Sequence, residues 1–108
     1  MMSVDDNRII AERELTFSYN GQNVRHKLTV QVHLPVEVNP KDADFDVSPG
    51  TASCRVEFQG LDEPPYIAHG ADGLQALEFA VNIDPILRSM QKKYSFYFPS
   101  GEDYFDES

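Results

Sequence analysis

Apolar and polar residues alternate in two neighbouring segments near the start of the chain. In residues 8–19 one set of alternate positions is mainly apolar and consists of Ile9, Ala11, Leu15, Phe17 and Tyr19. The second segment, residues 24–34, follows the dipeptide Asn20-Gly21, which favours a tight two-residue turn. Period-two alternation is typical of a half-buried strand, so the two segments predict a β-hairpin. A two-residue loop would place Phe17 opposite Val24.

Three shorter segments also have the character of strands. Residues 53–60 alternate with Cys54, Val56 and Phe58 on one side, residues 65–70 follow a turn, and residues 94–99 form an aromatic run. Pro35 ends the second strand because proline has no N–H to donate to a neighbouring strand. Residues 36–51 contain four acidic residues, and we expect them to form a long acidic loop.

Residues 70–94 are the one stretch that predicts a long helix. Asp72 can cap its first turn by accepting hydrogen bonds from backbone N–H groups, with Gln75 as its capping-box partner. Pro85 either kinks this helix or begins a second one with Asp84 as its N-cap, and we expect one kinked helix. The apolar face that we expect against the sheet consists of Leu74, Leu77, Val81, Ile83 and Leu87.

Together these elements predict a two-layer α+β domain. We expect a mainly antiparallel sheet of four or five strands in meander order, with the kinked helix packed on one face. Residues 1–108 form a single domain by length. Residues 1–7 and 100–108 are expected to be flexible termini, although Tyr104 and Phe105 could hold the tail on the sheet.

The composition is that of a globular domain that needs no disulfide or metal to fold. Hydrophobic residues make up 41% of the 108 residues, and a chain of this length buries about two-thirds of its unfolded surface. Cys54 is the single cysteine, which excludes an intramolecular disulfide and a cysteine-based zinc site. The sequence has neither a secretion signal nor an apolar run long enough to span a bilayer. We therefore expect a cytoplasmic protein.

The net charge of the chain is −9 at pH 7, from nine Lys and Arg residues against eighteen Asp and Glu residues. This charge repels phosphate backbones and anionic lipids, which disfavours nucleic acids and membrane surfaces as partners and favours a basic protein. Asp42, Asp44 and Asp46 of the acidic loop are the residues that we expect to contact such a partner. Their D-x-D-x-D spacing resembles a calcium loop, but Val47 replaces the glycine that the loop requires, which favours a solvated acidic loop.

We predict no catalytic, metal or cofactor site. The strand alternation places His26 and His33 on opposite faces of the sheet, so they cannot share a metal ion with His69. Cys54 lies on the inward side of its strand, which favours a buried and inert thiol.

Four polar residues are candidates for a binding site between the sheet and the start of the helix: Arg13, His26, Asp72 and Gln75. Arg13 interrupts the apolar side of the first strand, where it could pair with Asp72, reach solvent or grip a ligand. His26 lies on the same side of the sheet, and Gln75 lies in the first helical turn. A pocket formed by Arg13, His26, Gln75 and Cys54 would suit a small molecule.

Three short motifs lie in the expected strands and helix. They are I-A-x-R-x-L at residues 10–15, C-x-V-x-F-x-G at residues 54–60 and D-x-L-Q-A-L at residues 72–77. Together they resemble a family of small bacterial proteins of unknown function, over about half of the chain. The chain departs from that family in its long acidic loop and at Pro85. The resemblance implies a small protein with a β-sheet and a helix, and it implies no activity.

Two functions are compatible with these features. The first is a non-catalytic binding or accessory protein that neutralises a basic partner, as a toxin-immunity protein does. The second is a small-molecule binding protein or a minor enzyme that uses the pocket near the helix start. The chain could also form a homodimer through a sheet edge or through the aromatic segment at residues 94–99.

Overall fold

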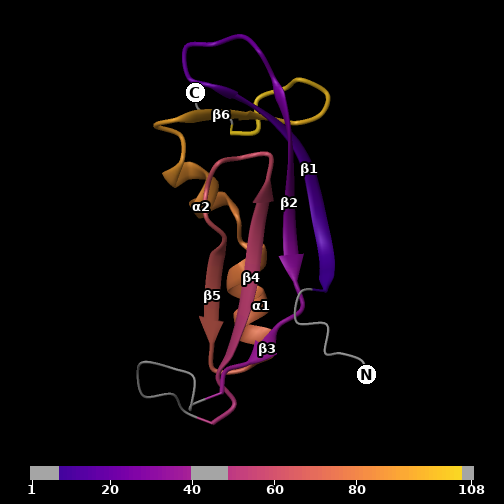
Figure 1. Cartoon of the computed structure of the whole chain (residues 1–108), viewed down its shortest axis with the longest axis vertical. Coiled ribbons are helices and arrows are strands. Elements are labelled where there is room, and N and C mark those ends of the chain that lie inside the picture. The colour runs from indigo at the N-terminus through magenta and orange to yellow at the C-terminus, as the bar shows by residue number, and fades with distance from the viewer. Residues whose placement is uncertain (1–7, 40–48, 106–108) are drawn as a thin grey trace.

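The computed structural model describes residues 8–39 and 49–105, which form six strands and two short helices (Figure 1). The strands are β1 (Ile9–Tyr19), β2 (His26–His33), β3 (Val36–Glu37), β4 (Ala52–Gln59), β5 (Tyr66–Gly70) and β6 (Tyr94–Tyr97). The helices are α1 (Gly73–Val81) and α2 (Asp84–Ser89). Asp42, Asp44 and Asp46 lie outside the described residues.

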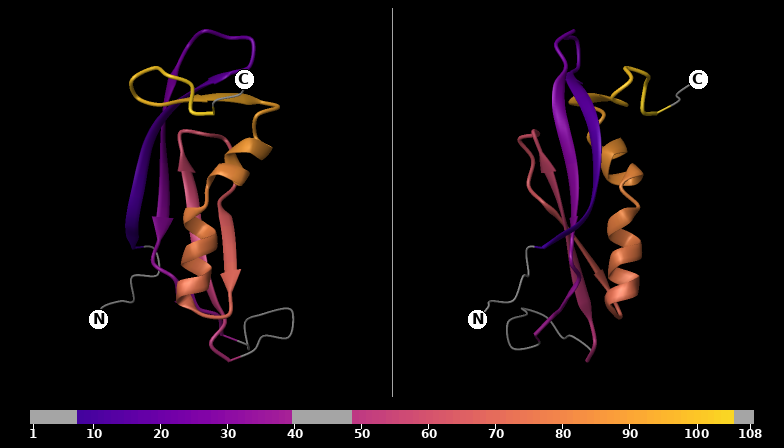
Figure 2. Two further views of the ribbon diagram at one scale, coloured as in Figure 1. Left: turned by 180° about the vertical axis from the view of Figure 1, so that it is seen from behind. Right: turned by 90° about the vertical axis from the view of Figure 1, so that its right-hand side faces the viewer.

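All six strands belong to one antiparallel sheet. β1, β2, β4 and β5 follow one another as a meander, and β3 extends the line of β2 along β4. β6 returns to the other side of β1 and pairs with its second half, from Thr16 to Tyr19. Figure 2 shows both helices on one face of the sheet. The predicted two-layer α+β fold is therefore confirmed, with six strands in place of four or five.

The β1–β2 hairpin forms two residues away from the predicted register. Phe17 lies opposite His26 rather than Val24. The turn is still at the predicted dipeptide, where Gly21 has a φ of 84°, but residues 22–25 lie outside the strands and lengthen the loop. From Ala11 to Phe17 this shift of two residues keeps each side chain on its predicted face of the sheet, whereas the register is irregular between Ile9 and Ala11.

Two helices take the place of the single kinked helix that the sequence predicts. α1 ends at Val81, and Asn82 and Ile83 separate it from α2. Pro85 lies in the first turn of α2, where a missing N–H leaves no helical hydrogen bond unmade. The N-cap of α2 is Ile83 and not Asp84. Proline therefore starts a helix here instead of kinking one.

The face of α1 that packs on the sheet also differs from the predicted face. Leu74 is 80% exposed and Val81 is 51% exposed, whereas Ala76 and Ala80 are fully buried. α1 packs on β4 and β5, and a Cβ atom on Gly70 of β5 would lie 2.4 Å from the backbone nitrogen of Ala76. Backbones this close leave room for alanine and not for leucine, so the small side chains face the sheet.

The core lies between the helices and the inner face of the sheet. Ile83 and Leu87 are buried there, as predicted, and Leu77 is partly buried. The sheet contributes alternate residues from four strands, namely Leu15, Phe17, Leu28, Val30, Val32, Cys54, Val56, Phe58 and Ala68. The C-terminal part adds Tyr94, Phe96 and Phe105.

Two segments that were expected to be loop or tail belong to the folded domain. β3, at the start of the expected acidic loop, pairs with the first residues of β4. The backbone N–H of Tyr104 donates to the carbonyl oxygen of Phe96 at 3.0 Å, and Phe105 is buried. The tail is thus held on the sheet as far as Phe105, and residues 1–7, 40–48 and 106–108 lie outside the described part.

We predict that Gly70→Ala lowers the free energy of unfolding by about 1–3 kcal/mol, because the new methyl group would overlap the backbone of α1. Gly73→Ala is the control, since a Cβ atom there lies 3.7 Å from the Cβ of Pro35 and alanine is the better helix former. Urea unfolding measures both variants. Equal stabilities would contradict the close packing of α1 on β5.

Candidate functional site

The four candidate binding residues do not form one site. His26 begins β2, whereas Asp72 and Gln75 follow the end of β5. Gly70 of β5 pairs with the first residue of β4, and Thr29 of β2 pairs with the last. His26 and Asp72 therefore lie at opposite ends of the sheet.

Asp72 and Gln75 cap the start of α1, as their spacing predicts. Asp72 Oδ1 accepts a hydrogen bond from the backbone N–H of Gln75 at 2.9 Å. Gln75 Oε1 accepts one from the backbone N–H of Ala71 at 2.6 Å, one residue further back than in a standard capping box. Gly70 packs directly against this turn, which leaves no space for a ligand between the helix start and β5.

Arg13 pairs with the C-terminal tail and not with Asp72. Its Nη1 donates to the hydroxyl of Tyr104 at 2.7 Å, and that hydroxyl donates to Asp84 Oδ1 at 2.6 Å. Burial and the hydrogen bond to Asp84 raise the pKa of Tyr104, so its hydroxyl keeps the proton that it donates. The network joins β1, the first residue of α2 and the tail.

The remaining polar candidates contact other residues of the fold. The His26 ring lies 5.1 Å from the ring of Phe17 on the inner side of the sheet. Cys54 is buried and its Sγ donates to the carbonyl oxygen of His33 at 3.1 Å, while burial raises the pKa of its thiol. His33 Nε2 lies 3.1 Å from Glu57 Oε1. Among the described residues, no three His, Cys, Asp or Glu side chains gather as metal ligands would.

The first half of β1 is an open edge of the sheet. β6 pairs with β1 only from Thr16 onwards, so in the described part of the chain Ile9–Leu15 has a strand on one side alone, β2. Every residue from Ile9 to Glu14 is exposed, including Ala11 and Arg13 on the inner face. Such an edge presents backbone N–H and C=O groups to which a further strand can bind.

A narrow groove follows this edge, between β1 and the end of α1. It holds about 100 Å³ and is lined by Ala11, Glu12, Arg13, Val30, Val32, Val81 and Ile83. We call it the β1–α1 groove. Val30, Val32 and Ile83 are buried and form its floor, whereas Val81 is half-exposed on the helix side. Pockets for drug-sized ligands hold about 300–1,000 Å³, so the groove fits a side chain better than a cofactor.

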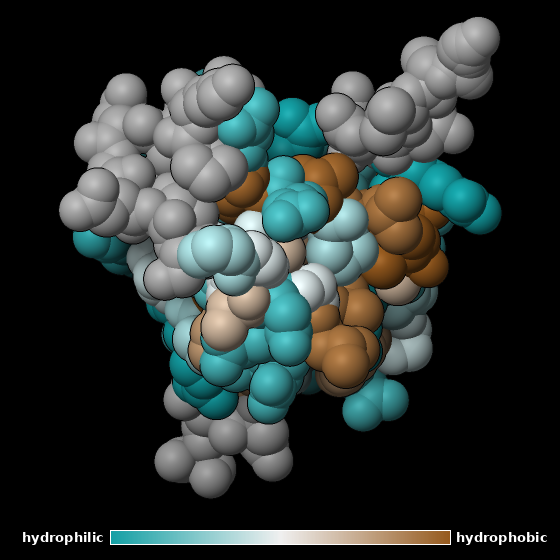
Figure 3. Space-filling model, turned by 90° about the horizontal axis from the view of Figure 1, so that it is seen from below, coloured by the Kyte–Doolittle hydropathy of each residue, from teal (hydrophilic) through white to brown (hydrophobic). Residues whose placement is uncertain are grey.

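Exposed apolar side chains continue beyond the groove towards the start of β1. Ile9, Ile10 and Leu34 are between 37% and 41% exposed, and Leu74 stands in the first turn of α1. Figure 3 shows this end of the molecule, where hydrophobic residues form several surface areas among polar ones. Contiguous apolar areas on a surface mark interaction sites more often than isolated apolar residues do.

The opposite face of the sheet is polar, and neither helix of the described residues lies on it (Figure 2). Gln31 Nε2 donates to Glu12 Oε2 at 2.7 Å, and Thr29 Oγ1 donates to Glu14 Oε2 at 3.1 Å. Lys27 Nζ lies 3.5 Å from Glu14 Oε1, with both side chains exposed. Exposed pairs such as these contribute little to stability. The two hydrogen bonds and the ion pair position the carboxylates of Glu12 and Glu14 beside the open edge of β1.

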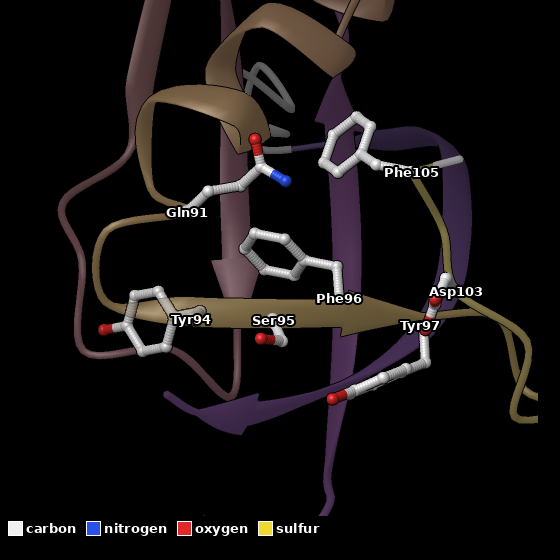
Figure 4. A pocket seen from close by; sticks show the side chains of 7 residues that line it. All are labelled: Gln91, Tyr94, Ser95, Phe96, Tyr97, Asp103 and Phe105. Carbon is white, nitrogen blue, oxygen red and sulfur yellow. The ribbon is translucent and has the colours of Figure 1, made fainter. Parts of the chain in front are cut away.

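A second hollow lies beside β6, between the end of α2 and the tail. It holds about 220 Å³ and is lined by Gln91, Tyr94, Ser95, Phe96, Tyr97, Asp103 and Phe105. Figure 4 shows the Gln91, Phe96 and Phe105 side chains gathered on one side of the strand. Ser95 Oγ already donates to Asn20 Oδ1 at 2.8 Å. This hollow is also below the usual volume for a small-molecule site, and it is the weaker candidate.

Glu63 fastens the turn between β4 and β5 to the start of β6. Its Oε2 accepts hydrogen bonds from Lys93 Nζ at 3.0 Å and from the Tyr94 hydroxyl at 2.8 Å. These hydrogen bonds, that from Lys93 first, lower the pKa of Glu63. Burial, and then the hydrogen bond to Glu63, raise the pKa of Tyr94 to about 12. The cluster connects the β4–β5 turn to β6, and none of its residues lines the β1–α1 groove.

Comparison with protein-family models, with curated proteins and with solved structures found no match. The resemblance to a family of small bacterial proteins stays a prediction. Across residues 8–39 and 49–105, no helix is long and apolar enough to cross a membrane. The candidate site is therefore defined by its geometry alone: an open strand edge, an apolar groove beside it, and two carboxylates on the outer face.

The alternating pattern did not identify the open edge or the groove, although two signals were present. Arg13 interrupts the apolar side of its strand, and α1 has more apolar residues than one packed face can bury. Ala76 and Ala80 form one row on the helix, and Leu74 and Val81 form another. Only one row can face the sheet, so the other had to be exposed.

We predict that Tyr104→Phe lowers the free energy of unfolding by about 1 kcal/mol, because it removes the hydrogen bonds to Arg13 and Asp84. Tyr66→Phe, on an exposed tyrosine, is the control and should change stability by less than about 0.5 kcal/mol. Chemical denaturation measures both. If the two substitutions have the same effect, the network does not hold the tail.

We also predict that Glu63→Gln makes the free energy of unfolding less dependent on pH in the acid range. The pKa of Glu63 is lower in the folded state than in the unfolded one, so its contribution is present above the usual glutamate value of about 4.3 and is lost as the pH falls below it. Urea unfolding between neutral and strongly acidic pH measures this. Wild type should lose more stability over the acid range than the variant. Parallel curves would show that Lys93 and Tyr94 do not stabilise the charged carboxylate.

Proposed function

We propose that this chain is a non-catalytic binding protein that neutralises a basic partner protein, in the manner of an immunity protein. The observation that carries the proposal is the β1–α1 groove, an apolar surface at an open strand edge with Glu12 and Glu14 beside it. An apolar centre with a polar rim is the usual arrangement of a protein–protein interface.

The charge of the chain supports a basic partner. With a net charge of −9, the chain attracts cationic proteins over a distance of about one Debye length and speeds their association at low salt. Asp42, Asp44 and Asp46 would add to this attraction, although they lie outside the described residues. The single, buried Cys54 is compatible with a reducing cytoplasm, where we place this function.

The alternative, a small-molecule binding protein or minor enzyme, has less support. It requires Arg13, His26, Gln75 and Cys54 to converge on one pocket. Arg13 donates a hydrogen bond to Tyr104, Gln75 caps α1, and Cys54 of β4 is buried in the core. Both hollows described above are smaller than a typical small-molecule site.

We predict that affinity capture from the source organism, with the tagged chain as bait, recovers a basic protein whose binding weakens as salt rises from about 0.05 M to about 0.5 M. The double variant Glu12→Gln, Glu14→Gln should bind it several-fold more weakly. The double variant Glu78→Gln, Glu102→Gln, which removes two exposed carboxylates outside the groove, is the matched control. Recovery of no basic protein, or binding that is indifferent to salt, would contradict the proposal.

A further inference from the structure

We propose that the basic partner binds by adding a strand to the open edge of β1, as an extended segment in which basic residues alternate with aliphatic ones. This inference rests on the proposed function and specifies its site and binding mode. Strand addition is a recurrent way for one protein to bind an extended segment of another.

The backbone of β1 provides the first part of the site. In an antiparallel sheet the N–H and C=O groups of alternate residues point to opposite neighbours. β2 takes one set over Ile9–Leu15, apart from an irregularity between Ile9 and Ala11, and the other set points to the open edge. At about 3.4 Å per residue, this edge is about 20 Å long and can pair with a segment of about seven residues.

The groove selects the inward side chains of the added strand. Side chains of neighbouring strands lie beside each other on the same face, so the inward residues of the partner would meet Ala11 and Arg13. Beyond them lies the wall formed by Val81 over the buried Ile83. The volume of about 100 Å³ and the apolar floor suit an aliphatic side chain such as that of valine or leucine.

The outer face selects the other set of side chains. Glu12 and Glu14 stand on that face of β1, exposed and next to the open edge. Residues directly opposite them on an added strand would have Cβ atoms about 5 Å away, at which distance opposite charges attract and like charges repel. The favoured outward residues are therefore lysine or arginine.

A second copy of the chain fits this edge less well. If two copies paired antiparallel through β1, their outer rows would lie side by side, and each row carries Glu12 and Glu14. Pairing centred on Glu12 or on Arg13 would put carboxylates, or two guanidinium groups, directly opposite each other. Both copies also have a net charge of −9. The charge pattern thus favours a basic segment over self-association.

The test uses the whole chain and a synthetic peptide of about seven residues in which lysine and valine alternate, matching the length of the open edge. A peptide of the same composition with its valines contiguous is the control. We expect the alternating peptide to slow amide hydrogen exchange in Ile9–Leu15 and to shift the NMR signals of Ala11 and Val81. The contiguous peptide should bind more weakly. Equal binding of the two peptides, or protection at β5 in place of β1, would overturn the inference.

Two groove variants and a matched control locate the site. Val81→Lys puts a charge into the groove from the helix side and should weaken binding of the alternating peptide at least about tenfold. Ala11→Lys repeats the test from the strand side, at an exposed position. Phe79→Lys makes the same charge change on the same helix, at a position about as exposed as Val81 and outside the residues that line the groove, and should change binding less than about twofold. Equal losses with Val81→Lys and Phe79→Lys would overturn the inference.

Three further outcomes decide between this inference and the proposed function. If the captured partner is basic and salt-sensitive but the peptide maps away from β1, the proposed function stands and strand addition is wrong. If sedimentation finds a dimer that Val81→Lys dissociates, a second copy occupies the edge and the inference is likewise wrong. If neither a basic protein nor the alternating peptide binds, both proposals fail.

Discussion

The close contact between α1 and β5 decides the shape of the rest of the molecule. Because Gly70 has no Cβ atom, the backbone of the first turn of α1 can lie closer to β5 than it could with any other residue at position 70. Ala76 and Ala80 fill the remaining space between the helix and the sheet. The helix therefore sits over β4 and β5, at one side of the sheet. A helix is about 10–12 Å across and neighbouring strands are about 4.8 Å apart, so one helix cannot cover all the strands.

The consequence of this placement of α1 is seen at β1, across the sheet from β4 and β5. β6 pairs with the second half of β1, and the tail reaches Arg13 of the first half through the Arg13–Tyr104–Asp84 network. Among residues 8–39 and 49–105, the first half, Ile9–Leu15, pairs with β2 alone, and it has an open edge, an apolar groove and exposed carboxylates. Charged residues on an edge strand, here Glu12, Arg13 and Glu14, oppose pairing with another strand that carries like charges opposite them. We propose that a basic partner binds this edge.

The strands could be predicted from the sequence because alternation fixes which face of a strand is buried, as it does for Leu28 and Val30. It could not fix the hairpin register, because a shift of two residues leaves the same faces buried. Helical periodicity could not choose between the Ala76 row and the Leu74 row, since that choice depends on contact with Gly70. The bond between Arg13 and Tyr104 joins residues 91 positions apart, and no local pattern predicts it.

Amide hydrogen exchange of the free chain tests most directly whether the first half of β1 is open. If no strand pairs with this edge, every second amide from Ala11 to Leu15 should exchange rapidly, while the alternate amides bonded to β2 and the amides of Val30 and Val56 exchange slowly. Uniform protection from Ile9 to Leu15 in a chain shown to be monomeric would contradict the account, because it would mean that the edge is already covered.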